Sequence, residues 1–334
     1  MEYTFLGRTG VRVSRLCFGA SFGTDVDESV VAALFRRCRD AGINFFDTSD
    51  VYYEGAAEAA LGKVIADCRN EIVLESKCGF PTGPDANARG LSRRHIMLAV
   101  EDSLKRLRTD HLDLYYFHTF DSGTPIEESL RAMDDLVHQG KIRYPAVSNW
   151  AAWQIAKALG IAAREGLAPF ESVQPMYSLV KRQAEVEILP MARAEQMGVV
   201  VYSPMAAGLL SGKYSKKNKP KDGLLMWDPV QTTRYGEPEY WEIAERFTAH
   251  AKKRGVHPAA LSRAWVLSHP AVTAVIVGAR DLEQLEIALG TLDVQMTPEW
   301  RAEISALSPE PPPATDRSEA RSGIYYLGWG DPKK

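Results

Sequence analysis

Four residues that could together move a proton follow separate apolar runs of the chain. Asp47, Tyr52, Lys77 and His118 each lie at or just past the end of a short run typical of a β-strand. A cation and a buried carboxylate beside a phenol are expected to lower its pKa from roughly 10 toward the working pH. The phenol could then act as a proton donor. These residue types therefore predict reductase chemistry on a carbonyl group.

Eight apolar runs alternate with segments whose apolar residues have helical spacing. This alternation is typical of parallel strands joined by helices, and eight such units predict a closed (β/α)8 TIM barrel. The predicted strands are Leu16–Ala20, Asn44–Thr48, Ile72–Lys77, Asp113–His118, Arg143–Asn149, Ser172–Met176, Val199–Ser203 and Val272–Ala279.

Local signals place helix ends and a hairpin around these strands. Residues 1–15 alternate apolar and polar side chains around two glycines, which predicts a β-hairpin that closes the barrel floor. Residues 124–127 (Thr-Pro-Ile-Glu) predict a helix with Thr124 as N-cap. Ser92, and Asp281 with Gln284, predict two further helix N-termini.

Length and charge restrict the class of protein. The 334 residues suit one barrel domain over 1–334, because such barrels commonly run about 250 residues plus insertions. The formal net charge is -3 with both signs mixed along the chain, so neither nucleic acid nor an anionic membrane is an expected partner. No apolar run reaches the roughly 20 residues that span a bilayer, and the first residues lack a signal-peptide pattern. We expect a cytoplasmic protein, while the oligomeric state stays open.

Two segments depart from the barrel pattern. Residues 215–239 are rich in Lys, Asp and Pro and follow the seventh strand, so we predict a long loop that acts as a cofactor lid. Residues 309–334 combine four prolines with several aromatic residues, which a disordered tail seldom carries. We expect this tail to pack back on the barrel, and whether it reaches the site stays open.

The motifs along almost the whole chain resemble those of the aldo-keto reductase family. Their joint order and spacing carry this resemblance, whereas any one tripeptide would be a weak signal. The glycine-rich pieces are more similar to the branch of bacterial oxidoreductases and potassium-channel β-subunits than to the aldose reductase branch. The matching segments are residues 46–52 with Glu58 and 61–62, then 76–77, 113–118, 140–143, 147–149, Gln174, 202–204, 208–214, and 278–280 with Gln284.

The resemblance implies a nicotinamide-dependent reductase. In it, Tyr52 would be the general acid for reduction and the general base for oxidation, Lys77 would hold its ammonium near the phenol, and Asp47 would orient Lys77. A neutral His118 would position and polarise the substrate carbonyl. Each residue alone has an ordinary explanation, such as packing or helix capping. The presence of this whole tetrad at one end of a barrel favours the catalytic interpretation.

The same resemblance assigns residues to the cofactor. Ser148, Asn149 and Gln174 would bind the nicotinamide carboxamide, and Tyr202 would stack on its ring. The pyrophosphate would lie among Ser203, Met205, Gly208 and Lys213. Further candidates are Gly278, Arg280 and Gln284, with Arg234 in the presumed lid. Arg280 near a helix N-terminus suits a 2′-phosphate, so NADP(H) is favoured over NAD(H), although a surface ion pair is the alternative.

Several positions depart from the family pattern. Tyr53 and Ala146 stand where glycines are usual, and Ile287 and Ala288 replace an acid and an Asn that usually meet the adenine. How the adenine is held is therefore open. The candidate substrate walls are Phe22, Tyr53, Phe80, Phe120 and Trp150. This aromatic rim with few charges favours a neutral aldehyde or ketone, but no single compound can be named.

Three classes of protein remain after these observations. The first is the reductase with a small-molecule carbonyl or alcohol substrate. The second is a binding subunit that senses bound nicotinamide while turning over slowly. The third is a metal-dependent barrel enzyme that uses Asp47 and His118. Lys77 argues against that third class, because an ammonium among metal ligands repels the cation, so we expect no metal.

Overall fold

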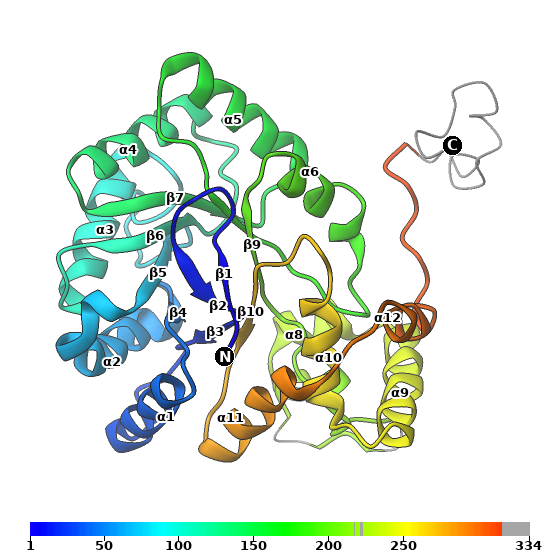
Figure 1. The fold of residues 1–334 in the computed structure, drawn as a ribbon. Helices are drawn as coiled ribbons and strands as arrows, with labels where there is room; N and C mark the ends of the chain where they lie inside the picture. Colours follow the sequence, from blue (N-terminus) through cyan, green and yellow to red (C-terminus); the bar gives the residue numbers. More distant parts are fainter. Residues whose placement is uncertain (217, 221–222, 316–334) are drawn as a thin grey trace, which may run out of the picture.

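Eight parallel strands form a closed barrel, as the sequence predicts (Figure 1). The computed structural model describes residues 1–216, 218–220 and 223–315. Around the barrel the strand order is β10-β3-β4-β5-β6-β7-β8-β9, with β10 pairing both β3 and β9. The strands are β3 (Leu16–Gly19), β4 (Phe45–Asp47), β5 (Val73–Cys78), β6 (Leu112–Phe117), β7 (Ile142–Ser148), β8 (Ser172–Gln174), β9 (Gly198–Val201) and β10 (Ala274–Val277).

Helices surround the barrel and connect successive strands (Figure 1). One face of each main helix is apolar and packs on the strands, which is the usual solution for a parallel sheet. The α-helices are α1 (Glu28–Asp40), α2 (Ala56–Ile65), α3 (Arg93–Leu107), α4 (Ile126–His138), α5 (Ala152–Glu165), α6 (Ile188–Ala194), α7 (Leu224–Trp227), α8 (Pro229–Tyr235), α9 (Pro238–Lys253), α10 (Pro258–Leu267), α11 (Leu282–Leu289) and α12 (Pro298–Ser305). The 3-10 helices are η1 (Tyr52–Gly55), η2 (Ala66–Glu71), η3 (Gln183–Glu185), η4 (Leu209–Ser211) and η5 (Gly290–Asp293).

The barrel interior has an apolar lower part and a polar upper part. Side chains of a strand alternate in direction, so every second residue points inward. Phe45 and Val73 belong to an apolar cluster in the lower part. Two residues further along the same strands come Asp47 and Glu75, which lie opposite each other in the β4–β5 register. The polar part is thus reached at the carboxyl ends of the strands, where barrel enzymes place their sites.

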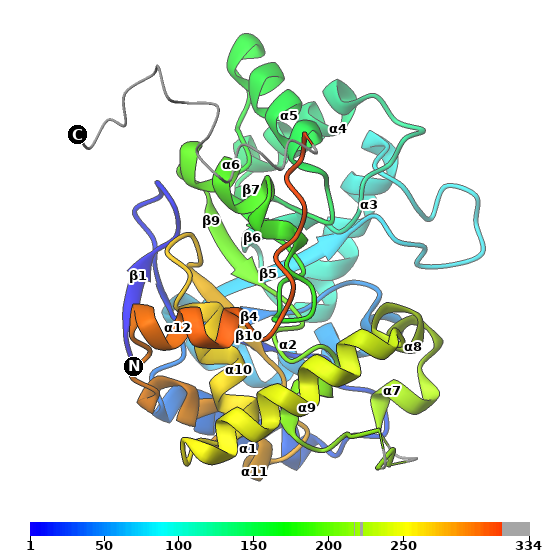
Figure 2. The same ribbon diagram turned by 90° about the vertical axis from the view of Figure 1, so that its right-hand side faces the viewer.

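The hairpin closes the lower end of the barrel, as predicted. Its strands β1 (Tyr3–Phe5) and β2 (Arg12–Ser14) pair antiparallel. Leu6 and Val13 are fully buried and join the same apolar cluster as Phe45. Figure 2 shows β1 at one end of the barrel and helices α7 and α8 at the other.

Two of the three predicted helix caps are confirmed. Ser92 accepts a hydrogen bond from His95 N at 3.3 Å, and Asp281 accepts one from Gln284 N at 2.8 Å. The prediction of Thr124 as N-cap is wrong: the cap residue of α4 is Pro125, without a side-chain bond. The Thr124 hydroxyl instead donates to Asp121 Oδ2 at 2.7 Å, because this neighbouring carboxylate is the stronger acceptor.

The two irregular segments have different outcomes. Residues 215–239 are not simply a long loop, because α7, α8 and the start of α9 lie within them. Asp228 caps α8 and a proline follows it at the first helical position, a start signal that the loop prediction overlooked. Only 309–315 of the predicted tail is described, so the prediction for its aromatic residues lies outside the described residues. Within the described part of the chain, no helix is both long and apolar enough to cross a bilayer.

Candidate active site

A buried ion pair forms the base of the site. The Lys77 ammonium donates to Asp47 Oδ1 and to the carbonyl oxygen of Thr48, the latter at 2.7 Å. Lys77 is completely buried and Asp47 is 2% exposed. Burial lowers the pKa of Lys77, but neighbouring acidic groups, the paired Asp47 foremost, outweigh this effect and raise it overall. Lys77 therefore stays a cation at any physiological pH.

Tyr52 lies next to this ion pair, in the short helix that follows β4. The Lys77 ammonium is 5.0 Å from the centre of its ring. The predicted lowering of the Tyr52 pKa is wrong for this structure: burial of the phenol raises its pKa, and the charge and hydrogen bonding of Lys77 offset this only in part. Desolvation of the phenolate outweighs the attraction of a single ammonium. The phenol consequently holds its proton at neutral pH, as a proton donor must.

His118 directly follows β6, and its ring contacts that of Tyr52. Their rings meet edge to face, with centroids 5.8 Å apart, and Phe80 contacts the imidazole in the same way at 4.7 Å. Burial, and then the charge of Lys77, hold the pKa of His118 well below its ordinary value. The expectation of a neutral imidazole is confirmed.

The backbone after Tyr52 explains a departure noted in the sequence. Tyr53 and Glu54 have φ angles of +50° and +55°, in the left-handed region. This region costs a residue with a Cβ roughly 1–2 kcal/mol, whereas glycine enters it freely. A glycine is thus the ordinary choice at position 53, and this chain instead places an aromatic ring there, 54% exposed.

The sequence prediction did not include three buried polar residues that lie beside the tetrad. Glu75 is fully buried and accepts a hydrogen bond from Gln174 Nε2 at 2.9 Å. Ser49 and Asp50 lie between β4 and Tyr52 and are 0% and 3% exposed. A signal for Glu75 existed, because it precedes Lys77 by two residues and must share its face of the strand.

The residues assigned to the nicotinamide form one hydrogen-bonded group. Asn149 Nδ2 donates to His118 O at 2.9 Å and to Ser148 Oγ at 3.1 Å, and Asn149 Oδ1 accepts from the Tyr202 hydroxyl at 2.6 Å. Gln174 Nε2 donates to Asp47 Oδ1 as well as to Glu75. The structure therefore brings these predicted residues against Asp47 and His118, and the Gln174 amide nitrogen is bound to the carboxyl groups of Asp47 and Glu75.

The segment after β9 holds the residues assigned to the pyrophosphate. Ser203, Ala206, Ala207 and Gly208 all have positive φ angles, between +52° and +92°, so the chain turns sharply within these six residues. The Gly208 amide donates to Met205 O at 3.1 Å, so this N–H is used in a hydrogen bond within the loop itself. Lys213 is exposed near the end of this segment. From α8, the charge of Arg234 reaches the Tyr202 phenol, whose pKa burial raises to about 12.

The segment after β10 carries the remaining cofactor candidates. Arg280 is exposed directly before α11, and its backbone amide donates to Gln284 Oε1 at 3.2 Å. Gly278 is exposed, with open space where a Cβ would lie. Because β9 and β10 are neighbours, the three cations Lys213, Arg234 and Arg280 follow adjacent strands. Amides at one side and cations at the other fit a dinucleotide with a nicotinamide and several phosphates.

The candidate substrate walls fall into two groups. Phe80 is 37% exposed against His118, and Tyr53 is exposed beside Tyr52. Phe120 is partly buried and meets Trp150 edge to face at 4.9 Å. Trp150 and Phe22 are almost fully buried, the first stacked on Phe117 and the second against Phe18, so both rings take part in core packing.

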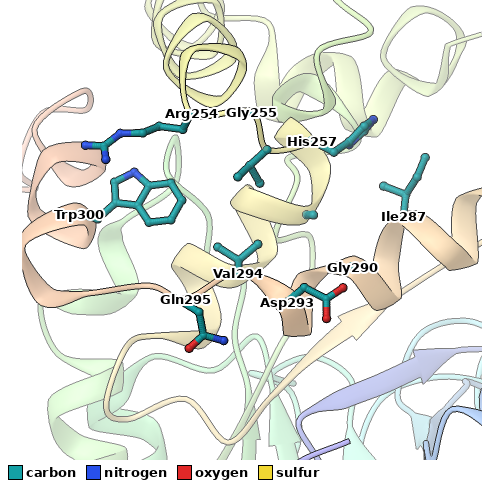
Figure 3. A pocket seen from close by; sticks show the side chains of 11 residues that line it. Arg254, Gly255, His257, Ile287, Gly290, Asp293, Val294, Gln295 and Trp300 are labelled. Carbon is teal, nitrogen blue, oxygen red and sulfur yellow. The ribbon is translucent and has the colours of Figure 1, made fainter.

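A separate cavity of about 540 Å³ lies away from the tetrad (Figure 3). It is bounded by α10, α11, η5 and α12, and Trp300, Val294 and Ile287 are among its lining residues. Ile287 thus faces this cavity, whereas Ala288 is fully buried. Neither Arg280 nor Gln284 lines it.

The comparison with known proteins agrees with the geometry of the site. Residues 15–309 match the model of the aldo/keto reductase family. The chain belongs to this family. It is 38% identical over 324 residues to the uncharacterized oxidoreductase YrpG of Bacillus subtilis, an alignment that covers 93% of this chain and 97% of that protein.

Other relatives of this aldo/keto reductase carry names of two kinds. A probable voltage-gated potassium channel subunit beta of Oryza sativa subsp. japonica is 37% identical, over 95% of this chain and 99% of that protein. The versiconal hemiacetal acetate reductase of Aspergillus parasiticus is 30% identical, over 90% and 94%. Family and relatives together support an oxidoreductase that uses a nicotinamide cofactor.

Proposed function

We propose that the chain reduces a neutral aldehyde or ketone to an alcohol with NADPH, and that Tyr52 is the general acid. The observation that carries this proposal is the completely buried Lys77–Asp47 pair beneath the Tyr52 phenol. A buried cation is costly unless it is paired. Here the Lys77 ammonium is paired with Asp47 and also faces Tyr52, whose phenol becomes an anion when it gives up its proton. A metal is not needed for this chemistry.

Each side chain has one task in the proposed reaction. Tyr52 gives its proton to the carbonyl oxygen during reduction and takes it from the alcohol during oxidation. Lys77 stabilises the phenolate that remains, and Asp47 holds Lys77 in place. His118 is neutral, so it forms a hydrogen bond to the substrate oxygen without placing a second positive charge near Lys77. The nicotinamide, when bound, supplies the hydride.

The cofactor would lie across the upper end of the barrel. The group of Ser148, Asn149 and Tyr202 would hold the nicotinamide end, and Lys213 and Arg234 the phosphates. Arg280 supports NADP over NAD, because an exposed guanidinium can bind a 2′-phosphate through two hydrogen bonds.

The exposed rim supports a neutral substrate. Phe80 and Tyr53 present aromatic surface beside His118 and Tyr52, and such surface favours apolar or weakly polar molecules. The relative that is named for a hemiacetal acetate reductase supports the same class, since a hemiacetal is a masked carbonyl without a charge.

A single-atom change tests the proposal. Tyr52→Phe should keep NADPH binding but lose at least about a hundredfold in turnover, because it removes only the transferable proton. Tyr3→Phe is the matched control, since Tyr3 lies in the hairpin at the opposite end of the barrel. NADPH oxidation would be followed at its absorbance band with a panel of aldehydes and ketones. Unchanged turnover in Tyr52→Phe would remove Tyr52 from the mechanism.

A second function is favoured by the potassium channel relatives. The chain could sense bound nicotinamide as a binding subunit and turn over slowly. The same assay separates the two functions. NADPH binding without oxidation above background by any carbonyl on the panel would favour the sensor, whereas steady turnover would favour the reductase.

A further inference from the structure

A buried hydroxyl connects His118 to a carboxyl group that the reaction itself does not use. Ser49 Oγ lies 3.1 Å from His118 Nδ1 and 3.2 Å from Asp50 Oδ1. All three side chains are buried, at 0%, 8% and 3% exposure for Ser49, His118 and Asp50. Asp50 Oδ2 has no hydrogen-bond partner among the described residues. The three groups therefore form a short chain that ends at the imidazole.

The protons in such a chain are constrained by simple counting. A serine hydroxyl has one proton and can donate it to only one of its two neighbours. An ionised Asp50 can only accept, so Ser49 then donates to Asp50 and accepts a hydrogen bond from His118 Nδ1–H. The other ring nitrogen, Nε2, is left without a proton and can only accept a hydrogen bond.

The opposite order holds when Asp50 is protonated. The carboxylic acid donates to Ser49 Oγ, and Ser49 donates to a bare Nδ1 of His118. The ring proton then resides on Nε2, the nitrogen that does not face Ser49. In this state His118 offers a donor to a ligand oxygen.

We propose that Ser49 couples the protonation of Asp50 to the tautomer of His118, so that Nε2 donates to a carbonyl oxygen when Asp50 is protonated and accepts from an alcohol when Asp50 is ionised. Ser49 and Asp50 are positioning residues in this arrangement, because they act only through His118. The inference rests on the reductase function proposed above and adds a device that matches the site to one direction of the reaction.

The surroundings of Asp50 make it titrate near neutrality. Burial, and next the charge of Glu58 from α2, raise the pKa of Asp50 to about 7. Arg106 from α3 lowers it only in part, because its guanidinium is paired with Glu58 at 2.7 Å. Cys78 from β5 and Tyr115 from β6 also face Asp50, and burial raises the pKa of both, so they stay neutral.

The other groups around the imidazole keep one charge over the same pH range. His118 stays neutral because burial lowers its pKa, and Lys77 stays a cation because the paired Asp47 raises its pKa. Tyr52, edge to face with the imidazole, has a pKa that burial raises, so it also stays neutral. A change in His118 near pH 7 would therefore come through Asp50.

Nitrogen NMR of the ligand-free protein tests the coupling without any turnover. In ¹⁵N-histidine-labelled protein, the chemical shifts of the two ring nitrogens report which one carries the proton. His118→Gln identifies the signals of His118 among the seven histidines. The expected result is a proton on Nε2 at about pH 5.5 and on Nδ1 at about pH 8.5, with a midpoint near the pKa of Asp50. Unchanged His118 signals over this range would overturn the proposal.

Two variants separate coupling from other effects. Asp50→Asn removes the titrating carboxyl, so the tautomer should be the same at every pH, whichever of the two amide atoms faces Ser49. Ser49→Ala cuts the connection, so the tautomer should no longer follow pH, whereas Ser49→Thr keeps a hydroxyl and should restore the switch. A switch that persists in both Asp50→Asn and Ser49→Ala would overturn the proposal.

The pH profile of reduction supplies a second readout. Above about pH 7, kcat/KM of the wild type should fall about tenfold per pH unit as the donor on Nε2 is lost, and this inflection should be absent in Asp50→Asn. An identical inflection in that variant would contradict the coupling. An NMR switch in a protein that turns over no carbonyl would support the coupling and refute the reductase function, so the two failures are distinguishable.

Discussion

The buried Asp47–Lys77 pair allows a double-mutant cycle whose outcome follows from its burial. Lys77→Met leaves Asp47 without its cation, and Asp47→Asn leaves the ammonium without its main counter-ion, in a region where both side chains are at most 3% exposed. Removing one partner of a buried pair costs about 3–5 kcal/mol, because the remaining charge is desolvated and uncompensated. Each single variant should lower the free energy of unfolding by about that amount.

The double variant Asp47→Asn, Lys77→Met should lose no more than one single variant. No unpaired charge remains in it, because burial holds the pKa of the neighbouring Glu75 well above its ordinary value and that carboxyl stays protonated, and a methionine fills the volume of the lysine stem. The additive sum would be roughly 6–10 kcal/mol, so the expected coupling is about 3–5 kcal/mol. Urea unfolding at neutral pH would measure the free energy of unfolding of the wild type, the two single variants and the double variant. An equal slope of this free energy against urea concentration in all four would be the check for two-state behaviour.

A matched control comes from an exposed ion pair on α3. Lys105 and Asp102 are 3.3 Å apart one helical turn from each other, with most of both side chains in solvent. Their cycle should show almost no coupling, because water screens both charges. If the buried pair were as additive as this exposed one, the account of Lys77 as a desolvated, fully compensated cation would be refuted.

Two further predictions concern exposed positions at the upper end of the barrel. Arg280→Ala should weaken NADPH binding roughly tenfold or more but leave NADH binding nearly unchanged, since a charge-assisted bond to phosphate is worth about 1.5–3 kcal/mol. Quenching of tryptophan fluorescence would measure the binding of both cofactors. Equal losses of affinity for the two would mean that Arg280 does not bind the extra phosphate. Tyr53→Gly should raise the free energy of unfolding by about 0.5–1 kcal/mol, because it relieves the positive φ and gives up little buried surface. Tyr53→Ala keeps the strained backbone and is the control, so an alanine variant as stable as the glycine variant would contradict this explanation.

The sequence alone was sufficient for the barrel and for the position of the tetrad. Alternation of short apolar runs with helical segments is a local property, and a closed parallel barrel places the carboxyl ends of all its strands at one end. The order of the residues along the chain therefore places Asp47, Lys77 and His118 together. The hairpin at the floor follows in the same way, from two short alternating strands around glycines.

Local patterns were less reliable where a nearby group in space competed for the same hydrogen bond. Thr124 had the sequence of an N-cap, but Asp121 lies within reach of its hydroxyl and accepts its hydrogen bond. Residues 215–239 had the composition of a loop, yet they form two short helices. At Thr124 the deciding contact is a choice between alternatives of similar energy. The start of α8 is instead a local signal, Asp228 followed by a proline, which the loop prediction overlooked.

Only the tertiary structure decided the electrostatics of the site. Whether the Tyr52 pKa rises or falls depends on how completely neighbouring strands and loops remove water from the phenol, and the position of Lys77 in the chain does not contain that information. The chain from Asp50 through Ser49 to His118 joins β4 to β6, so its geometry exists only once the barrel has closed. Residue order thus determined which groups meet, and the packing around them determined which of these groups hold a proton.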